Sequence, residues 1–255
     1  MTEDPFRELV SILEKLRSPT GCPWDRQQTF KSLRPYLLEE TYEILDAIDN
    51  EQFARLREEL GDLIMHIVFQ AQIARELGLF DIDEVLRAIS AKLIRRHPHV
   101  FGNAEAKDAQ QVVENWEKIK LDESGKRLLS GVPCSLPALL RAFRVQEKAA
   151  GVGFDWANDR EVLAKISEEI KELRAAKRAN DQEKTFEEFG DLLFSMVNLA
   201  RFWGVTPEDA LRNTTEKFIR RFKYIEDSLK QQGRDVRQAT LAEMDALWDE
   251  AKKKE

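Results

Sequence analysis

Carboxylates recur in pairs along stretches with helical spacing. Glu188 and Asp191 stand three residues apart in an otherwise apolar run, and Glu169 and Glu172 form a similar pair nineteen residues earlier. Positions i and i+3 are neighbours on a helix, and apolar residues at helical period predict that the two helices pack together. The two pairs should then face each other. Carboxylate oxygens with no soft ligand nearby favour a hard cation, so we expect Mg²⁺, with Mn²⁺ as a substitute.

Both pairs have counterparts 129 residues earlier in the chain. These are Glu40, Glu43, Glu59 and Asp62. We call these four the first-half cluster, and the four later carboxylates the second-half cluster. A glycine, Gly61 or Gly190, lies inside the second pair of each cluster. Glycine inside a helix costs about 1 kcal/mol relative to alanine, so each glycine indicates a close approach by another backbone or by a ligand.

Basic residues repeat as well. Two pairs with i and i+4 spacing occupy corresponding positions, Lys92 with Arg96 and Lys217 with Arg221. Lys184 lies four residues before Glu188, and Arg55 is its counterpart in the first half. Cations opposite a cluster of carboxylates and Mg²⁺ suit phosphoryl transfer, because cations and metal together neutralise a polyphosphate.

The helices that must position these side chains follow from apolar periodicity, caps and breaks. Predicted helices span residues 5–16, 32–48, 51–77, 81–96, 110–121, 138–150, 160–179, 181–203, 207–232 and 240–254. No strand alternation of useful length occurs, and proline and glycine in residues 18–25 predict a loop. The sequence therefore predicts an all-α protein. Prolines and glycines in the middle of the chain divide it into two tandem helical-bundle domains, residues 1–122 and 138–255, with a linker at 123–137.

Composition narrows the class of protein. The chain has 255 residues, a formal charge of −7 and two cysteines far apart, Cys22 and Cys134. The negative charge argues against a surface that coats nucleic acid, and the cysteine spacing argues against structural zinc. There is no basic-then-apolar leader and no apolar run long enough to span a membrane. We expect a cytoplasmic protein without nucleic-acid or membrane partners.

The combined motifs, EExxE, then ExxD after a helical hairpin, then a KFIRRF-like third helix, are duplicated, and a Cys-Pro-Trp-Asp loop lies near the start. This pattern resembles the MazG family of nucleoside triphosphate pyrophosphohydrolases over nearly the whole chain. The resemblance implies an all-α fold, an intertwined homodimer, Mg²⁺ dependence, and hydrolysis of NTPs or dNTPs to the monophosphate and pyrophosphate.

The resemblance also assigns roles by position. In the second half the implied metal ligands are Glu169, Glu172, Glu188 and Asp191, the implied phosphate contacts are Lys184, Lys217 and Arg221, and Trp248 would lie near the nucleotide. The first half offers Glu40, Glu43, Glu59, Asp62, Lys92, Arg96 and Trp116, with Arg55 in place of lysine.

Bound Mg²⁺ would acidify and orient a water, and Glu168 or Glu169 is the candidate proton acceptor. Which phosphorus is attacked stays open. The halves differ at three positions near the clusters, where Lys184, Ser195 and Asn198 replace Arg55, His66 and Phe69. We therefore expect the second half to carry most of the activity, with equal activity as the alternative. A role for His66 as a metal ligand is the less favoured interpretation, because the second half has serine there.

Two other classes of protein share part of this pattern. A di-iron carboxylate bundle requires a Glu-x-x-His motif in each of two helices, and the chain has none. A non-catalytic helical dimer would explain the periodicity, but not the acidic clusters that recur with basic partners. Within the enzyme class, a dUTP or phosphoribosyl-ATP pyrophosphohydrolase is the alternative to a broad-specificity enzyme.

Overall fold

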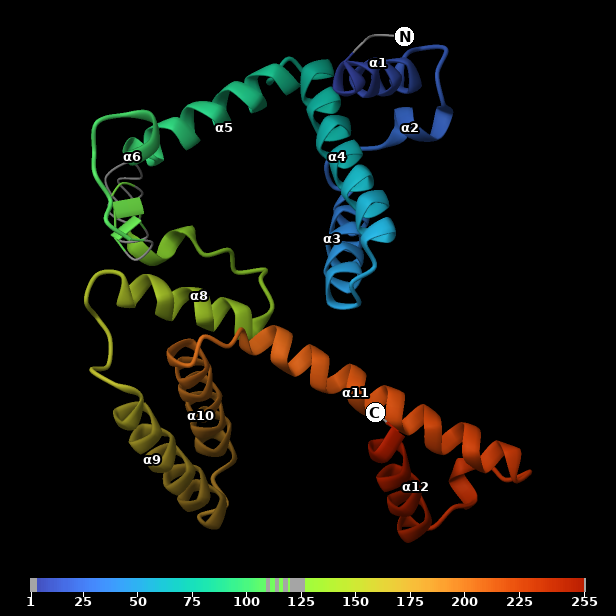
Figure 1. Ribbon diagram of the computed structural model, residues 1–255, viewed down its shortest axis with the longest axis vertical. Coiled ribbons are helices and arrows are strands. Elements are labelled where there is room, and N and C mark those ends of the chain that lie inside the picture. The colour runs from blue at the N-terminus through green and yellow to red at the C-terminus, as the bar shows by residue number, and fades with distance from the viewer. Residues whose placement is uncertain (1–3, 109–110, 113–114, 117–118, 120–126, 255) are drawn as a thin grey trace. The chain divides into compact units, whose positions relative to one another are not determined.

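The computed structural model describes residues 4–108, 111–112, 115–116, 119 and 127–254. These residues form helices, turns and loops without a strand, as predicted. The chain divides into two compact units, Met1–Ala106 and Lys107–Glu255 (Figure 1). The expected linker at 123–137 stays a prediction. Its first four residues, 123–126, and much of the helix expected at 110–121 lie outside the described residues.

The first unit is built around a helical hairpin. Its helices are α1 (Pro5–Arg17), α2 (Pro23–Gln27), α3 (Arg34–Asp49), α4 (Phe53–Glu76), α5 (Ile82–Arg96) and α6 (Pro98–Phe101). Helices α3 and α4 lie side by side, and α1 packs on α4 (Figure 1). Leu13, Leu33, Val68 and Phe69 form the buried centre of this unit. The prediction of a loop across residues 18–25 was wrong at its end, because Pro23 begins the short helix α2.

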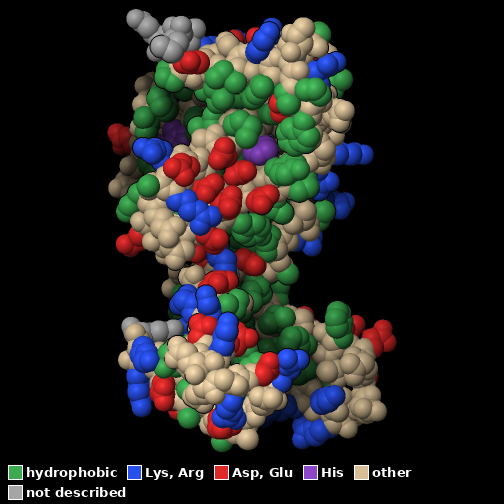
Figure 2. Space-filling model, turned by 90° about the vertical axis from the view of Figure 1, so that its right-hand side faces the viewer, with side chains coloured by type: hydrophobic (Ala, Val, Ile, Leu, Met, Phe, Trp, Pro, Cys, Tyr) green, Lys and Arg blue, Asp and Glu red, His purple; other side chains and the backbone are tan. Residues whose placement is uncertain are grey.

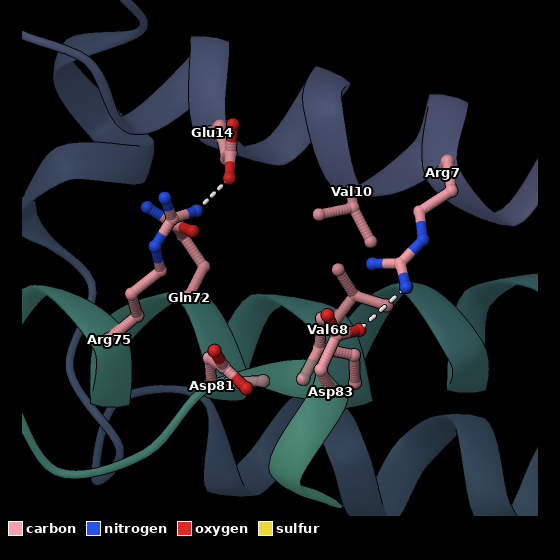
Figure 3. Close-up of a pocket in the computed structure, with 10 residues that line it drawn as sticks. Arg7, Val10, Glu14, Val68, Gln72, Arg75, Asp81 and Asp83 are labelled. Carbon is pink, nitrogen blue, oxygen red and sulfur yellow. Dashed lines mark hydrogen bonds and ion pairs between the residues drawn. The ribbon is translucent and has the colours of Figure 1, made fainter. Parts of the chain in front are cut away.

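Ion pairs attach α1 to the rest of the first unit. Arg7 pairs with Asp83 at 2.7 Å, and Arg75 pairs with Glu14 (Figure 3). They border a cavity of about 200 Å³ between α1, α4 and the start of α5. Asp81 caps α5 with a capping box formed with Glu84. These contacts hold the helices that support the first-half cluster.

The second unit repeats the hairpin. It contains η1 (Leu128–Gly131), α8 (Ala138–Ala150), α9 (Asp159–Arg178), α10 (Gln182–Phe202), α11 (Pro207–Gln231), η2 (Val236–Gln238) and α12 (Leu241–Lys254). Helices α9 and α10 lie side by side, α8 packs on α10, and α12 packs on α11 (Figure 1). Val162, Ile166 and Leu199 are buried where α9 meets α10.

The two hairpins turn at equivalent residues. Glu51 and Asn180, 129 positions apart, are the two non-glycine residues with positive φ in the described chain, at 53° and 57°. Helix α4 therefore starts at Phe53, and the prediction that it starts at Glu51 was wrong. A left-handed residue lets the chain reverse tightly. In both hairpins the second helix therefore returns along the first, and the carboxylates of the two helices face each other.

Candidate functional site: two carboxylate clusters

Three carboxylates of the second-half cluster converge between α9 and α10. One oxygen from each of Glu169, Glu172 and Glu188 lies within 4.8 Å of the others. Asp191 follows Glu188 by one turn of α10 and borders the same cavity as Glu169. Glu169 is buried, with 3% of its surface exposed. The helical spacing and the hairpin thus bring the two predicted pairs together.

The electrostatics of Glu188 fit a cation site. Burial raises the pKa of Glu188 above its usual 4.5, and the charge of Glu172 raises it further. Oxygens on opposite sides of a Mg²⁺ ion lie about 4.2 Å apart, because each Mg–O distance is about 2.1 Å. The cluster is close to that size and offers only hard oxygen donors, so its residues fit the expected ion.

Two lysines approach the second-half cluster. Lys184 Nζ is 3.9 Å from Glu188 Oε1. Lys165 Nζ is nearer, 2.7 Å from Glu169 and 3.0 Å from Glu168, and its bond with Glu169 raises its pKa. Sequence reasoning missed Lys165, although its i to i+4 spacing from Glu169 was a signal. Glu168 lies outside the cluster, with 57% of its side chain exposed.

The first-half cluster is neutralised by a residue of its own hairpin. Oxygens of Glu40, Glu43 and Glu59 lie within 4.8 Å of one another. Arg55 donates to Glu59 at 3.0 Å and to Glu43 at 3.2 Å, so one guanidinium joins both helices. Figure 2 shows acidic side chains gathered on one face of this unit. Burial and the charge of Asp62 raise the pKa of Glu40.

A cavity of about 620 Å³ opens beside the second-half cluster. Glu169 and Asp191 lie in its wall, and Gln146, Asn198 and Arg201 line it elsewhere. Its lining is mostly apolar, and Phe154 and Trp156 of the loop between α8 and α9 belong to it. The size is that of a small-molecule site. Asn198 was expected from the sequence, but Gln146 and Arg201 were not. Gln146 reaches the cavity only because α8 packs on α10, and Arg201 is held there by Asp155 of the loop between α8 and α9.

The comparisons with known proteins match both hairpins. The MazG nucleotide pyrophosphohydrolase domain matches residues 28–101 and 158–225, which include both clusters. The chain belongs to the MazG family. It is 50% identical over 251 residues to a Thermotoga maritima protein named nucleoside triphosphate pyrophosphohydrolase/pyrophosphatase MazG, covering 97% of this chain and 95% of that one. It is 46% identical over 254 residues to an Escherichia coli nucleoside triphosphate pyrophosphohydrolase, covering 97% of each.

Other relatives match over less of the chain. A Mycobacterium tuberculosis nucleoside triphosphate pyrophosphohydrolase is 38% identical over 149 residues, which cover 57% of this chain and 45% of that protein. A solved structure of a mazG-related protein from Thermotoga maritima covers 45% of this chain at 26% identity, with a TM-score of 0.39.

The paired basic residues that we expected to contact phosphate lie on other helices than the carboxylate clusters. Lys217 and Arg221 are on α11, where the Arg221 guanidinium lies 5.3 Å from the ring centre of Trp248 on α12. Phe218 also contacts Trp248, with ring centres 5.1 Å apart. Lys92 and Arg96 are on α5. Among the described residues, no hydrogen bond or ion pair joins Lys217 or Trp248 to a cluster carboxylate.

His66 lies at the edge of the first-half cluster. It is buried, stacks on Tyr36 with ring centres 6.4 Å apart, and places Nε2 3.7 Å from Glu40 Oε1. Burial lowers its pKa, which favours the neutral ring at neutral pH. In the second MazG domain the same position is Ser195, which lines the cavity.

Proposed function

We propose that this MazG protein is a Mg²⁺-dependent nucleoside triphosphate pyrophosphohydrolase of broad specificity. It releases pyrophosphate and the monophosphate from NTPs and dNTPs. The observation that carries the proposal is the convergence of Glu169, Glu172 and Glu188 beside a cavity of about 620 Å³. The identities of 46–50% to named pyrophosphohydrolases over nearly the whole chain support the same reaction.

The residues take the following roles. Glu169, Glu172, Glu188 and Asp191 hold the metal ion, for which Mn²⁺ can substitute. When bound, the ion neutralises phosphate charge and acidifies water. Glu169 is better placed than Glu168 to accept a proton, because Glu168 lies outside the cluster. Lys184 is placed beside Glu188 and binds phosphate oxygens, and Lys165 competes for Glu169 until a metal ion arrives.

We assign most of the activity to the second half. In the first half, Arg55 bonds to two ligands of the cluster, Glu43 and Glu59, and both would have to be released for a metal ion. In the second half, Lys165 bonds to only one, Glu169. Lys184, the counterpart of Arg55, is 3.9 Å from one carboxylate. The first-half ligand set of Glu40, Glu43, Glu59 and Asp62 is otherwise complete, so we give that half a weaker site.

The proposed assembly is an intertwined homodimer. Phe186, Phe189, Leu193 and Met196 form an exposed apolar stripe along α10. A Cβ added to Gly190, on the same face, would have no heavy atom within 4 Å, so this chain does not supply the close approach that the glycine indicates. Two other apolar residues of α10, Leu192 and Val197, do not belong to this stripe. Val197 is buried and Leu192 packs against the α9–α10 core. A second copy would cover the stripe and bring its α11 cations, Lys217 and Arg221, with Trp248, toward a cluster.

The decisive assay offers a panel of NTPs and dNTPs with Mg²⁺ and measures pyrophosphate and orthophosphate separately. We expect pyrophosphate from several substrates, and Mn²⁺ should restore turnover after metal removal. Turnover of dUTP or phosphoribosyl-ATP alone would favour the narrower alternatives. Release of orthophosphate only would end the proposal.

Matched variants in the full chain separate the halves. Glu188→Gln in the second half and Glu59→Gln in the first remove equivalent carboxylates. We expect Glu188→Gln to lose most of the turnover and Glu59→Gln to keep most of it. Equal losses would show two equal sites, and a larger loss in Glu59→Gln would reverse the assignment.

No described helix is both long enough and apolar enough to cross a membrane. Both cysteines are free thiols, in line with the reducing, cytoplasmic location that we propose.

A further inference from the structure

The polar residues of the second-half cavity do not serve the fold alone. Helices α1 and α8 both have 13 residues, and each has one buried residue, Leu13 and Gln146. Both stand at the ninth position of their helix. In the first unit, Leu13 packs in one core cluster with Phe69, the counterpart of Asn198. An apolar pair therefore satisfies this fold, whereas a buried amide costs free energy unless it is hydrogen-bonded.

Only one of the two polar atoms of the Gln146 side-chain amide makes a hydrogen bond. Its Nε2 donates to the backbone carbonyl of Phe194 at 2.8 Å. Its Oε1 is buried and accepts no hydrogen bond. A buried acceptor without a hydrogen bond is unfavourable, so a donor is missing at this wall of the cavity.

Asn198 supplies the complementary group one turn beyond Phe194. Arg201 Nη2 donates to Asn198 Oδ1 at 2.9 Å, which sets the orientation of the amide. Arg201 is itself held by Asp155 and lies over the Phe202 ring. No hydrogen bond of the described residues uses Asn198 Nδ2, so its two N–H groups are available to a ligand in the cavity that Asn198 lines.

An acceptor and a donor near each other in a mostly apolar cavity match the hydrogen-bonding edge of a nucleobase. Aromatic side chains at Phe154, Trp156 and Phe194 line the same cavity and can stack on a base. The carboxylates Glu169 and Asp191 lie in the wall, where a metal-bound triphosphate would begin.

We propose that the second-half cavity is a nucleobase pocket in which Gln146 accepts a hydrogen bond from the base and Asn198 donates one to it. This proposal rests on the proposed function, because it assigns the base of the same triphosphate. In the first unit, Leu13 and Phe69 are each only 2% exposed and lie together in the core. Gln146 and Asn198 therefore determine base specificity, and the metal cluster does not.

The test uses the full chain and substrates that differ only at the base. ATP and CTP are compared with purine riboside triphosphate and pyrimidin-2-one riboside triphosphate, which lack the exocyclic amine. Inorganic tripolyphosphate, which has no nucleoside, is titrated as an inhibitor. The variants are Gln146→Leu, which installs the first-half residue, and Asn198→Phe, which fills the cavity. Gln182→Leu at the exposed start of α10 is the matched control.

The wild type should prefer at least one amine-bearing substrate over its analogue. Gln146→Leu should lower kcat/KM for that substrate about tenfold or more, mainly through KM, and abolish the preference. Inhibition by tripolyphosphate should not change, and Gln182→Leu should behave as wild type. Asn198→Phe should weaken binding of 2-aminopurine riboside triphosphate without metal, measured by its fluorescence, while the melting temperature is kept.

Retention of the wild-type base preference in Gln146→Leu would overturn the proposal. An equal loss of tripolyphosphate binding would also overturn it, since the residue would then act on the phosphate site. If Gln146→Leu does not fold, unchanged fluorescence binding in Asn198→Phe overturns the proposal by itself. Failure of the proposed function is a separate result, namely that the wild type releases no pyrophosphate from any nucleotide.

Discussion

At Glu188 the requirements of stability and of metal binding oppose each other. Its carboxylate lies against Glu172 and Glu169, and this repulsion is relieved either by a proton or by a cation. Lys165 and Lys184 relieve part of it in the second half, and in the first half Arg55 does so by bridging Glu43 and Glu59. Glu188, which we propose as a metal ligand, is thus also a residue that the metal-free protein holds at a cost in stability.

Removing one ligand should separate these effects. We expect Glu172→Ala or Asp191→Ala to lower Mg²⁺-dependent turnover about 100-fold or more, because losing a group that only orients a metal ligand can already cost about 100-fold. The melting temperature without metal should stay equal or rise, because repulsion is relieved. The rise in melting temperature on adding Mg²⁺ should disappear. Glu187→Ala, an exposed acid on the same helix, is the control, and wild-type turnover in either variant would remove that residue from the site.

The raised pKa of Glu188 predicts a pH dependence. A carboxyl whose pKa is higher in the folded state than its usual 4.5 contributes stability below pH 4.5. That contribution is lost as the pH rises through the raised value. The metal-free wild type should therefore lose melting temperature relative to Glu188→Gln as the pH rises from 4.5 toward neutral. The stabilisation by Mg²⁺ should grow over the same range. Parallel melting curves for the two proteins would contradict this.

At the scale of elements, the hairpins are specified by their turns as well as by their apolar contacts. Asn180 suits the left-handed conformation, since asparagine is enriched there, whereas Glu51 does not. Both residues stand where the chain must reverse between two long helices. The first hairpin therefore keeps a strained residue that the second avoids.

Replacing Glu51 should stabilise the first hairpin. We expect Glu51→Gly to raise the free energy of unfolding by about 0.5–1 kcal/mol, because glycine adopts positive φ without a steric penalty. Asn180→Gly should change it less, and Asn180→Ala should lower it. Chemical denaturation of the full chain measures all three. A loss of stability in Glu51→Gly would mean that the side chain has a stabilising contact in solution.

At the scale of the whole molecule, the apolar stripe on α10 predicts self-association. Leu193→Glu places a charge in the middle of this stripe, where a partner helix would have to desolvate it. We expect light scattering to give the mass of two chains for the wild type and of one for the variant, with turnover reduced. Gln27→Glu adds the same charge at the exposed end of α2, away from α10, and should remain dimeric. One chain mass for the wild type at micromolar concentration would contradict the dimer.

The amino-acid sequence by itself determined the features that depend on local spacing. Helix positions, the 129-residue repeat and the carboxylate pairs all follow from residues three or four apart, which one helix brings together whatever surrounds it. The hairpin partners were predictable too, because short turns force consecutive helices to lie antiparallel. The predicted start of α4 was two residues too early, at Glu51 instead of Phe53. No local pattern distinguishes a left-handed Glu51 from a helical one.

Only the tertiary structure decided what surrounds each cluster. Arg55 reaches across to Glu43, and Gln146 of α8 meets the backbone of α10, through contacts between helices distant in sequence. Equivalent positions can be filled by Leu13 and Phe69 or left open beside Gln146 and Asn198. Such differences depend on the volume and rotamers of side chains that meet between helices, which periodicity does not encode. The same local motif can therefore form a closed core in one half and an open cavity in the other.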